Sequence, residues 1–124
     1  MSSFYKQKFG WSPHKEMDDI VFFKMNGFIL ALYPVDELAK DAHIQNSGIG
    51  WKQFSFSINF NSTDEIDQEI TRLKNAGAKV LKEPQTAFWG GYSAYVEDPE
   101  ANIWEFAYNP FLEMDKDGNV LLHQ

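Results

Sequence analysis

The sequence predicts an α+β fold, with helices on the outer faces of curled, antiparallel-rich sheets. Residues 53–61 alternate apolar and polar side chains with a period of two, as half-buried strands do, and residues 103–108 are β-forming residues that divide between two faces with the same period. Residues 62–75 instead repeat apolar residues at helical spacing. The order of predicted elements in residues 4–34 recurs, with one extra strand, in residues 54–110. These observations predict two similar halves within one domain.

The composition narrows the class of protein. Hydrophobic residues make up 44% of the 124 residues and aromatic residues 16%, which indicates a folded globular protein. A net charge of −7 opposes binding to nucleic acids or anionic membranes, which requires clustered Lys and Arg. No apolar run approaches the roughly 18 residues of a membrane-spanning helix. There is no cysteine and no leader pattern at the N-terminus, so we expect a cytoplasmic protein.

The first half contains a short helix and a hairpin. Gly10 follows the helix as a C-terminal stop, and Asn26-Gly27 is a strong signal for a tight hairpin turn. Pro34 ends the return strand, and a polar bend is expected at 16–19. The predicted elements are a helix over 4–9, strands over 20–25 and 28–33, and a helical turn over 35–42 in the connector.

The second half carries clearer boundary signals. Ser62 is placed to cap a helix, with Glu65 completing a capping box, and Gly77 ends it. A short strand is expected at 78–81 and a loop at 83–86. On the preceding strand, Phe54, Phe56, Ile58 and Phe60 share one face, and Ser55, Ser57 and Asn59 share the other.

Residues 88–110 form the predicted hairpin on which the functional interpretation depends. Asp98-Pro99 presets the turn, because Pro restricts φ and the Asp side chain can accept from the backbone two residues on. In the second strand Ile103, Glu105 and Ala107 share one face. A carboxylate therefore lies among apolar neighbours, which makes Glu105 the candidate functional residue.

The same hairpin resembles the C-terminal hairpin of the vicinal oxygen chelate superfamily, which contains glyoxalase I (lactoylglutathione lyase), the bleomycin-resistance proteins and the extradiol dioxygenases. The residues that carry the resemblance are Trp89-Gly90-Gly91-Tyr92-Ser93, Asp98-Pro99-x-x-Asn102-x-Trp104-Glu105 and Ala107-Tyr108-Asn109-Pro110. The resemblance implies paired βαβββ modules, each curled around a cavity that usually holds a divalent metal. It divides the single domain, residues 1–124, into module one (1–34), a connector (35–52), module two (53–110) and a tail (111–124).

Module one has no room for the opening strand that the resemblance implies. Either the chain begins at an internal Met of a longer product, or this member lacks that strand. In both cases the first sheet has an unpaired edge. We expect a partner subunit to cover that edge, since family members of this size usually pair two chains, and so we predict a homodimer.

The resemblance also implies four metal ligands, of which this sequence retains one. The first ligand would lie on the absent strand. The second falls at or beside Leu30 and the third at Ile58, neither of which offers a donor. Only the fourth, Glu105, is retained, and one carboxylate cannot hold a divalent cation. We therefore expect no cofactor, unless other residues complete a site for a divalent metal.

Two interpretations of Glu105 stay open. It is either a carboxylate at the cavity mouth, paired with a Lys or with solvent, or a partly buried acid facing Phe54, Phe56, Ile58 and Ile103. In the second case desolvation favours its neutral form, and Glu105 becomes a candidate proton donor or base.

The functional prediction is a metal-free or metal-impaired member that binds a small organic molecule in an apolar cavity. The alternative is a lyase or isomerase similar to lactoylglutathione lyase, with Glu105 as the catalytic residue and metal ligands completed by a partner chain. A structural interaction module is a third possibility. The expected ligand-binding residues, chosen because aromatic and apolar side chains line small-molecule pockets, are Trp89, Tyr92, Phe56, Ile58, Leu30 and Trp51.

Overall fold

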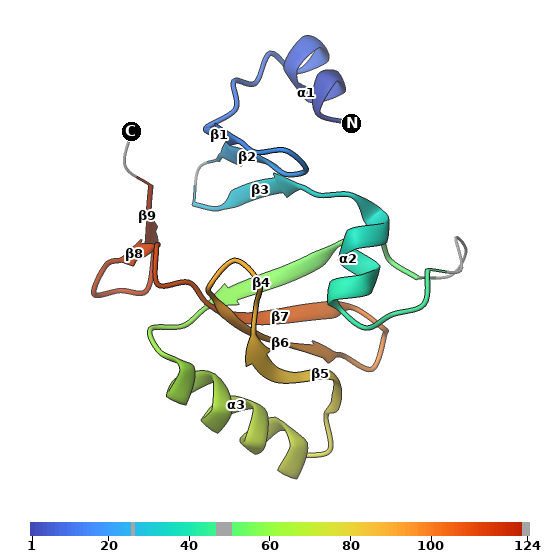
Figure 1. Cartoon of the computed structure of the whole chain (residues 1–124), viewed down its shortest axis with the longest axis vertical. Helices are drawn as coiled ribbons and strands as arrows, with labels where there is room; N and C mark the ends of the chain where they lie inside the picture. Colours follow the sequence, from blue (N-terminus) through green and yellow to red (C-terminus); the bar gives the residue numbers. More distant parts are fainter. Residues whose placement is uncertain (26, 47–50, 123–124) are drawn as a thin grey trace.

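The computed structural model describes residues 1–25, 27–46 and 51–122 and confirms an α+β fold with helices and mixed sheets (Figure 1). Two sheets carry most of the strands, one in each half of the chain. A third, two-stranded sheet, β8 (Glu113–Met114) with β9 (Val120–Leu121), forms the tail. The connector begins with α2 (Val35–Asp41), as the sequence predicts.

The second half is a complete βαβββ module. Its elements are β4 (Ser55–Asn59), α3 (Thr63–Asn75), β5 (Lys79–Thr86), β6 (Tyr92–Glu97) and β7 (Ile103–Tyr108). The strand order is β4-β7-β6-β5, with β4 parallel to β7 and the other pairs antiparallel. Helix α3 covers one face of this sheet (Figure 1). Strand β4 is therefore an edge strand.

The first half has the same order of elements without a preceding strand. Within the described residues it consists of α1 (Ser2–Lys8), β1 (Lys15–Glu16), β2 (Val21–Lys24) and β3 (Ile29–Leu32), with the sheet order β1-β2-β3. Asn26 of the predicted turn lies outside the described residues, but the Met25 N–H donates to the Phe28 carbonyl at 3.0 Å. The hairpin prediction holds for the strands on either side.

Local signals placed the helix boundaries correctly in module two. The Ser62 Oγ accepts from the Glu65 N–H at 3.2 Å, and a Glu65 carboxylate oxygen accepts from the Asn61 N–H at 2.7 Å. Both bonds satisfy donors at the helix start that have no partner within the helix. Gly77 follows the C-cap with φ +89°, a conformation that costs glycine little.

Two local predictions were wrong, one of them in part. The bend expected at 16–19 is present at Asp18–Asp19, but Glu16 belongs to the short strand β1 (Lys15–Glu16), because this segment pairs with β2 through residues 21–22. The segment 83–86 is not a loop but the end of β5. Register shifts within the β5–β6 pair let this strand continue past Pro84, which is why its sequence lacks a regular alternation.

The module-two sheet has two unlike faces. On the α3 face, Ile66 and Ile70 pack with Ala94, Val96 and Phe106 in a wholly apolar cluster. On the opposite face, Tyr95 and Ile103 pack under the end of α2 and the connector, with Lys82 buried beside them; the apolar residues there are Leu38, Ala42, Ile44, Trp51 and Leu81. None of the helices within the described ranges has the length and hydropathy that crossing a membrane requires.

Candidate functional site

A row of polar side chains crosses the sheet on the face opposite α3. The strand registers pair Lys82 with Tyr95, Tyr95 with Glu105, and Glu105 with Ser57, so that β5, β6, β7 and β4 each contribute one residue. Residues paired in this way project from the same face of a sheet. The row, together with Asp41 at the end of α2, is called the Glu105 cluster here.

Glu105 is half-buried, and both of its carboxylate oxygens are engaged. The Ser57 hydroxyl donates to Oε1 at 2.6 Å, and the Tyr95 hydroxyl lies 3.0 Å from Oε2. These contacts come from the strands on either side of β7. They hold the carboxylate in one orientation on the sheet.

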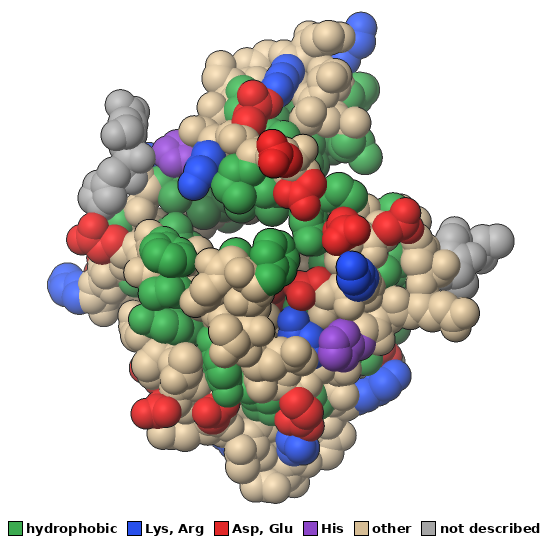
Figure 2. Space-filling view, viewed as in Figure 1, with side chains coloured by type: hydrophobic (Ala, Val, Ile, Leu, Met, Phe, Trp, Pro, Cys, Tyr) green, Lys and Arg blue, Asp and Glu red, His purple; other side chains and the backbone are tan. Residues whose placement is uncertain are grey.

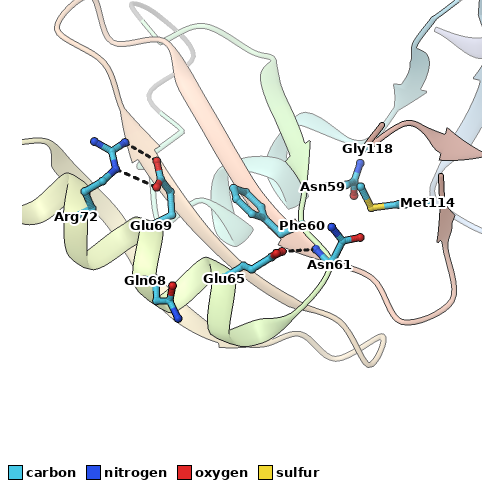
Figure 3. A pocket seen from close by; sticks show the side chains of 9 residues that line it. All are labelled: Asn59, Phe60, Asn61, Glu65, Gln68, Glu69, Arg72, Met114 and Gly118. Carbon is cyan, nitrogen blue, oxygen red and sulfur yellow. Dashed lines mark hydrogen bonds and ion pairs between the residues drawn. The ribbon is translucent and has the colours of Figure 1, made fainter. Parts of the chain in front are cut away.

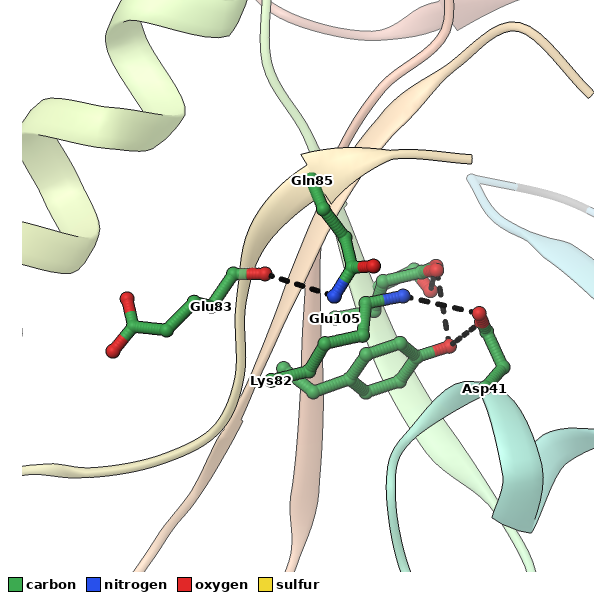
Figure 4. Close-up of polar contacts among 7 residues, drawn as sticks. Asp41, Lys82, Glu83, Gln85 and Glu105 are labelled. Carbon is green, nitrogen blue, oxygen red and sulfur yellow. Dashed lines mark hydrogen bonds and ion pairs between the residues drawn. The ribbon is translucent and has the colours of Figure 1, made fainter. Parts of the chain in front are cut away.

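The Tyr95 hydroxyl is also 2.8 Å from Asp41 Oδ2, so one phenol lies between two carboxylates (Figure 4). Tyr95 is only 2% exposed. Burial raises the pKa of its phenol, and the charges of Glu105 and Asp41 raise that pKa further. Tyr95 therefore keeps its proton throughout the physiological pH range.

Lys82 supplies the cluster with a buried positive charge. Its side chain is 5% exposed, and Nζ lies 3.0 Å from Asp41 Oδ1 and 5.0 Å from the centre of the Tyr95 ring (Figure 4). A buried charge is tolerated when it is paired and hydrogen-bonded. The Lys82–Asp41 pair thus ties α2 to the sheet.

Tyr33, which follows β3, lies near enough to the cluster for its carboxylates to act on the Tyr33 phenol. Burial raises the pKa of Tyr33, and the carboxylates of Asp41, Asp19, Glu37 and Glu105 add to this shift. The side chains around Tyr33 therefore give a negative field where the end of β3 meets the cluster. Figure 2 shows the molecule hollowed between the module-one sheet and the larger sheet, with hydrophobic side chains bordering the opening.

Of the two interpretations of Glu105, the one that has it facing Phe54, Phe56 and Ile58 was wrong. The parallel register places Ser57 beside Glu105, so the alternation of β4 sends the apolar residues to the other face. There the Phe56 ring lies 4.7 Å from Trp104, and Phe56 and Ile58 remain 46% and 40% exposed. Ile103 does share the face of Glu105.

The remaining predicted ligand-binding residues are dispersed. Tyr92 lies on the α3 face and donates to Asp67 at 2.6 Å, which raises the pKa of Tyr92 to about 12. Trp89 packs its ring over Gly91, where a Cβ would lie 1.8 Å from the indole. Leu30 pairs with Phe23 on the face that Trp11 contacts. Trp51 packs with the apolar cluster of Tyr95 and Ile103 and is, of the six, the one that these contacts bring to the Glu105 face.

The sequence analysis missed Asp41, Ser57 and Lys82 as neighbours of Glu105. Ser57 was identified only as part of a polar strand face. The βαβββ strand order, which makes β4 and β6 the two neighbours of β7, is the signal that would have aligned Ser57 and Tyr95 with Glu105.

The residues of the cluster do not fit a divalent metal. No group of three or more His, Cys, Asp or Glu side chains suited to a metal occurs in the part of the chain that the structure describes. The cluster offers two carboxylates, one bound to Lys82 and one to Ser57 and Tyr95. A divalent cation needs more oxygen or nitrogen donors than these.

A surface depression of about 490 Å³ lies elsewhere, between the start of α3 and the β8–β9 turn (Figure 3). Its largest polar feature is the Arg72–Glu69 ion pair, with contacts of 3.0 and 2.5 Å. The depression does not include Glu105. It is lined by Asn59, Phe60, Asn61, Glu65, Gln68, Glu69, Arg72, Met114 and Gly118.

Comparison with known proteins shows which family and which solved structures the chain is similar to. The sequence model of the Glyoxalase/Bleomycin resistance protein/Dioxygenase superfamily matches residues 1–106. No curated protein matches the chain. Among solved structures, a glyoxalase-related enzyme from Fulvimarina pelagi is 32% identical, with the match covering 99% of this chain and 88% of that chain at a TM-score of 0.55.

Two further structures are less similar in sequence. The NAD-dependent benzaldehyde dehydrogenase from Legionella pneumophila is 20% identical over 86% of this chain and 85% of that chain, with a TM-score of 0.69. At this identity the likeness concerns the fold alone. A lactoylglutathione lyase from Agrobacterium tumefaciens is 25% identical over 87% of this chain and 82% of that chain, with a TM-score of 0.42.

Proposed function

Because this chain belongs to the glyoxalase/bleomycin resistance protein/dioxygenase superfamily, we propose that it binds a small organic molecule at the Glu105 cluster, without a metal held by its own side chains. The observation that carries the proposal is the orientation of Glu105. Ser57 and Tyr95 hold its carboxylate half-buried on the sheet face that the connector partly covers. An oriented polar group among apolar side chains is typical of small-molecule sites.

The neighbours of Glu105 contribute to ligand binding in different ways. Trp51 is partly exposed and offers aromatic surface on the same face, where it packs with the buried Ile103. Each carboxylate oxygen can accept more than one hydrogen bond, so Glu105 can still accept one from a ligand. The buried Lys82 and Tyr95 fix the geometry of the cluster before the ligand arrives, which lowers the entropic cost of binding.

Substitution of Glu105 tests this function. Aromatic and alicyclic compounds are first screened by thermal shift, and the affinity of each hit is measured by calorimetry. Glu105→Gln should weaken a hit by roughly ten-fold or more, because a hydrogen bond to a charged group contributes about 1.5–3 kcal/mol. Glu100→Gln, an exposed carboxylate in the 98–102 turn, is the matched control. Equal affinities in wild type and Glu105→Gln would place the site elsewhere.

Metal analysis of the purified protein tests the metal-free part of the proposal. We expect no stoichiometric metal, and no saturable binding of Ni²⁺ or Zn²⁺ that Glu105→Gln abolishes. Stoichiometric metal that is lost in Glu105→Gln, but retained in Glu100→Gln, would show that further donors complete a site around Glu105.

A lyase or isomerase activity is the second candidate, favoured by the 32% identity to a glyoxalase-related enzyme. In that case Glu105 serves as the base, oriented by Ser57 and Tyr95. Turnover of S-lactoylglutathione, measured with and without added Ni²⁺ or Zn²⁺, is the direct assay. Activity that survives in Glu105→Gln would remove this residue from the reaction.

Homodimerisation is part of the same proposal. Strand β4 is the outer strand of its sheet; Phe56 and Ile58 on it, and Phe54 just before it, are 46%, 40% and 49% exposed. Apolar side chains on a free strand edge favour pairing with another chain. The mass of one chain is 14.3 kDa. Light scattering coupled to size exclusion should give twice this mass. A monomeric mass at micromolar concentration would contradict the dimer.

A further inference from the structure

The Glu105 cluster has one hydrogen-bond donor fewer than its geometry requires. The Tyr95 oxygen lies 2.8 Å from an Asp41 oxygen and 3.0 Å from a Glu105 oxygen. A phenol has a single O–H and can donate to only one of these acceptors. The other carboxylate then faces an oxygen lone pair at hydrogen-bond distance.

The other donors of the cluster do not make up the deficit. The ammonium of Lys82 is 3.0 Å from Asp41, and the Ser57 hydroxyl is 2.6 Å from the Glu105 oxygen that Tyr95 does not approach. The cluster therefore contains two carboxylates, one ammonium and a phenol that burial keeps protonated. Among the residues that the structure describes, Asp41 has a charged partner and Glu105 has none.

We infer that the ligand of this site brings the missing donor, as a protonated amine or a hydroxyl group that meets Glu105, and that the site excludes carboxylates. This inference rests on the proposed function, because it assumes that a small molecule binds at Glu105. When the ligand donates to Glu105, the Tyr95 proton is free to satisfy Asp41, and every polar group of the cluster is paired. The ligand thereby removes the repulsion between the Tyr95 oxygen and the carboxylate to which Tyr95 does not donate.

The charges around the cluster favour the amine over the hydroxyl. Besides Asp41 and Glu105, the carboxylates of Asp19 and Glu37 act on Tyr33 at the edge of the cluster. The ammonium of Lys82 is 5% exposed and already paired with Asp41, so little of it is open to an anionic ligand. A carboxylate would bring acceptors into a site that lacks donors.

Ligands that differ in one group test the inference. Benzylamine, benzyl alcohol and benzoate present the same ring with a cationic donor, a neutral donor and an anionic acceptor. We expect the affinity of wild type to fall in that order, with benzoate at least ten-fold weaker than benzylamine. In Glu105→Gln the advantage of benzylamine should shrink by about ten-fold, whereas Glu100→Gln should keep it.

The outcomes separate the two levels of the proposal. Benzoate binding as tightly as benzylamine, and weakened by Glu105→Gln, would overturn the inference and leave small-molecule binding at Glu105 intact. If all three compounds bind and none responds to Glu105→Gln, the proposed site itself is wrong. If none of the three binds to wild type, the inferred ligand class is overturned, while the wider compound screen still decides whether the site binds any small molecule.

A measurement without ligand tests the missing donor directly. A Gln at position 105 keeps an acceptor for Ser57 and offers an N–H to the Tyr95 oxygen, which lets Tyr95 donate to Asp41. Glu105→Gln should therefore raise the midpoint of thermal unfolding, although it weakens amine binding. In a Tyr95→Phe background the same substitution should lose this effect. A lowered midpoint in Glu105→Gln, or an equal shift in the wild-type and Tyr95→Phe backgrounds, would show that the cluster does not lack a donor.

Discussion

Tyr92 and Tyr95 lie three residues apart on β6 and point to opposite faces of the sheet. On the α3 face, the Tyr92 phenol meets one carboxylate, that of Asp67, at 2.6 Å. On the other face, the Tyr95 phenol meets two, those of Asp41 and Glu105. The first face pairs its polar groups one to one over an apolar core, as a structural face does. The second is left short of a donor, as the proposed ligand site requires.

The largest expected effect lies in the core of the α3 face. Ile70 is 2% exposed and packs in the cluster of Ile66, Val96 and Phe106. Ile70→Ala should reduce the free energy of unfolding by about 2–5 kcal/mol, because it removes buried methyl groups and leaves a cavity. Denaturant unfolding measures the loss. Ligand affinity at the Glu105 cluster should be unchanged under native conditions, and a parallel loss of affinity would show that the two faces are not independent.

An intermediate effect is expected at Lys82, where removal of the ammonium leaves Asp41 without its charged partner. Lys82→Met should reduce the free energy of unfolding by about 1–3 kcal/mol, a moderate value because the Asp41 side chain is 37% exposed and retains some solvation. The double variant Lys82→Met with Asp41→Leu should recover most of that loss, since a buried pair and an apolar pair are often similar in stability. Additive losses in the double variant would contradict this account.

The smallest effect on stability is expected for the hydrogen bond between the Tyr92 phenol and the Asp67 carboxylate. Tyr92→Phe should reduce the free energy of unfolding by about 0.5–1.5 kcal/mol through loss of its hydrogen bond to Asp67. Tyr108, which pairs directly with Tyr92 across the strands, provides the matched control, and Tyr108→Phe should change little.

The Tyr92–Asp67 hydrogen bond also predicts that the stability of the fold decreases at alkaline pH. The pKa of Tyr92 is raised from its ordinary value of 10 to about 12 in the folded protein. Its contribution to stability is therefore fully present below pH 10 and is lost as the pH rises from 10 through 12. Unfolding measured across this range should show a steeper loss in wild type than in Tyr92→Phe. Identical slopes would mean that the hydrogen bond does not form in solution.

The sequence predicted the order and type of most elements because their signals are local. The Ser62–Glu65 capping box, Gly77 and the alternation of residues 103–108 each depend on neighbours within a few positions. The same locality explains the errors in the first sheet and in β5. Lys15–Glu16 forms a strand only through pairing with β2, and the end of β5 only through an irregular register with β6.

The sequence by itself determined that Glu105 lies on a strand with Ile103 and Ala107, since side-chain direction along a strand follows from the backbone period of two. Only the tertiary structure decided what Glu105 faces. The parallel β4–β7 register brought Ser57 beside it in place of the Phe residues, and the docking of α2 brought Asp41. Register and helix docking depend on contacts between residues 41 to 54 positions apart, such as Lys82 with Asp41 and Tyr95 with Asp41. No local pattern encodes such contacts, because they follow from burial summed over the whole sheet face.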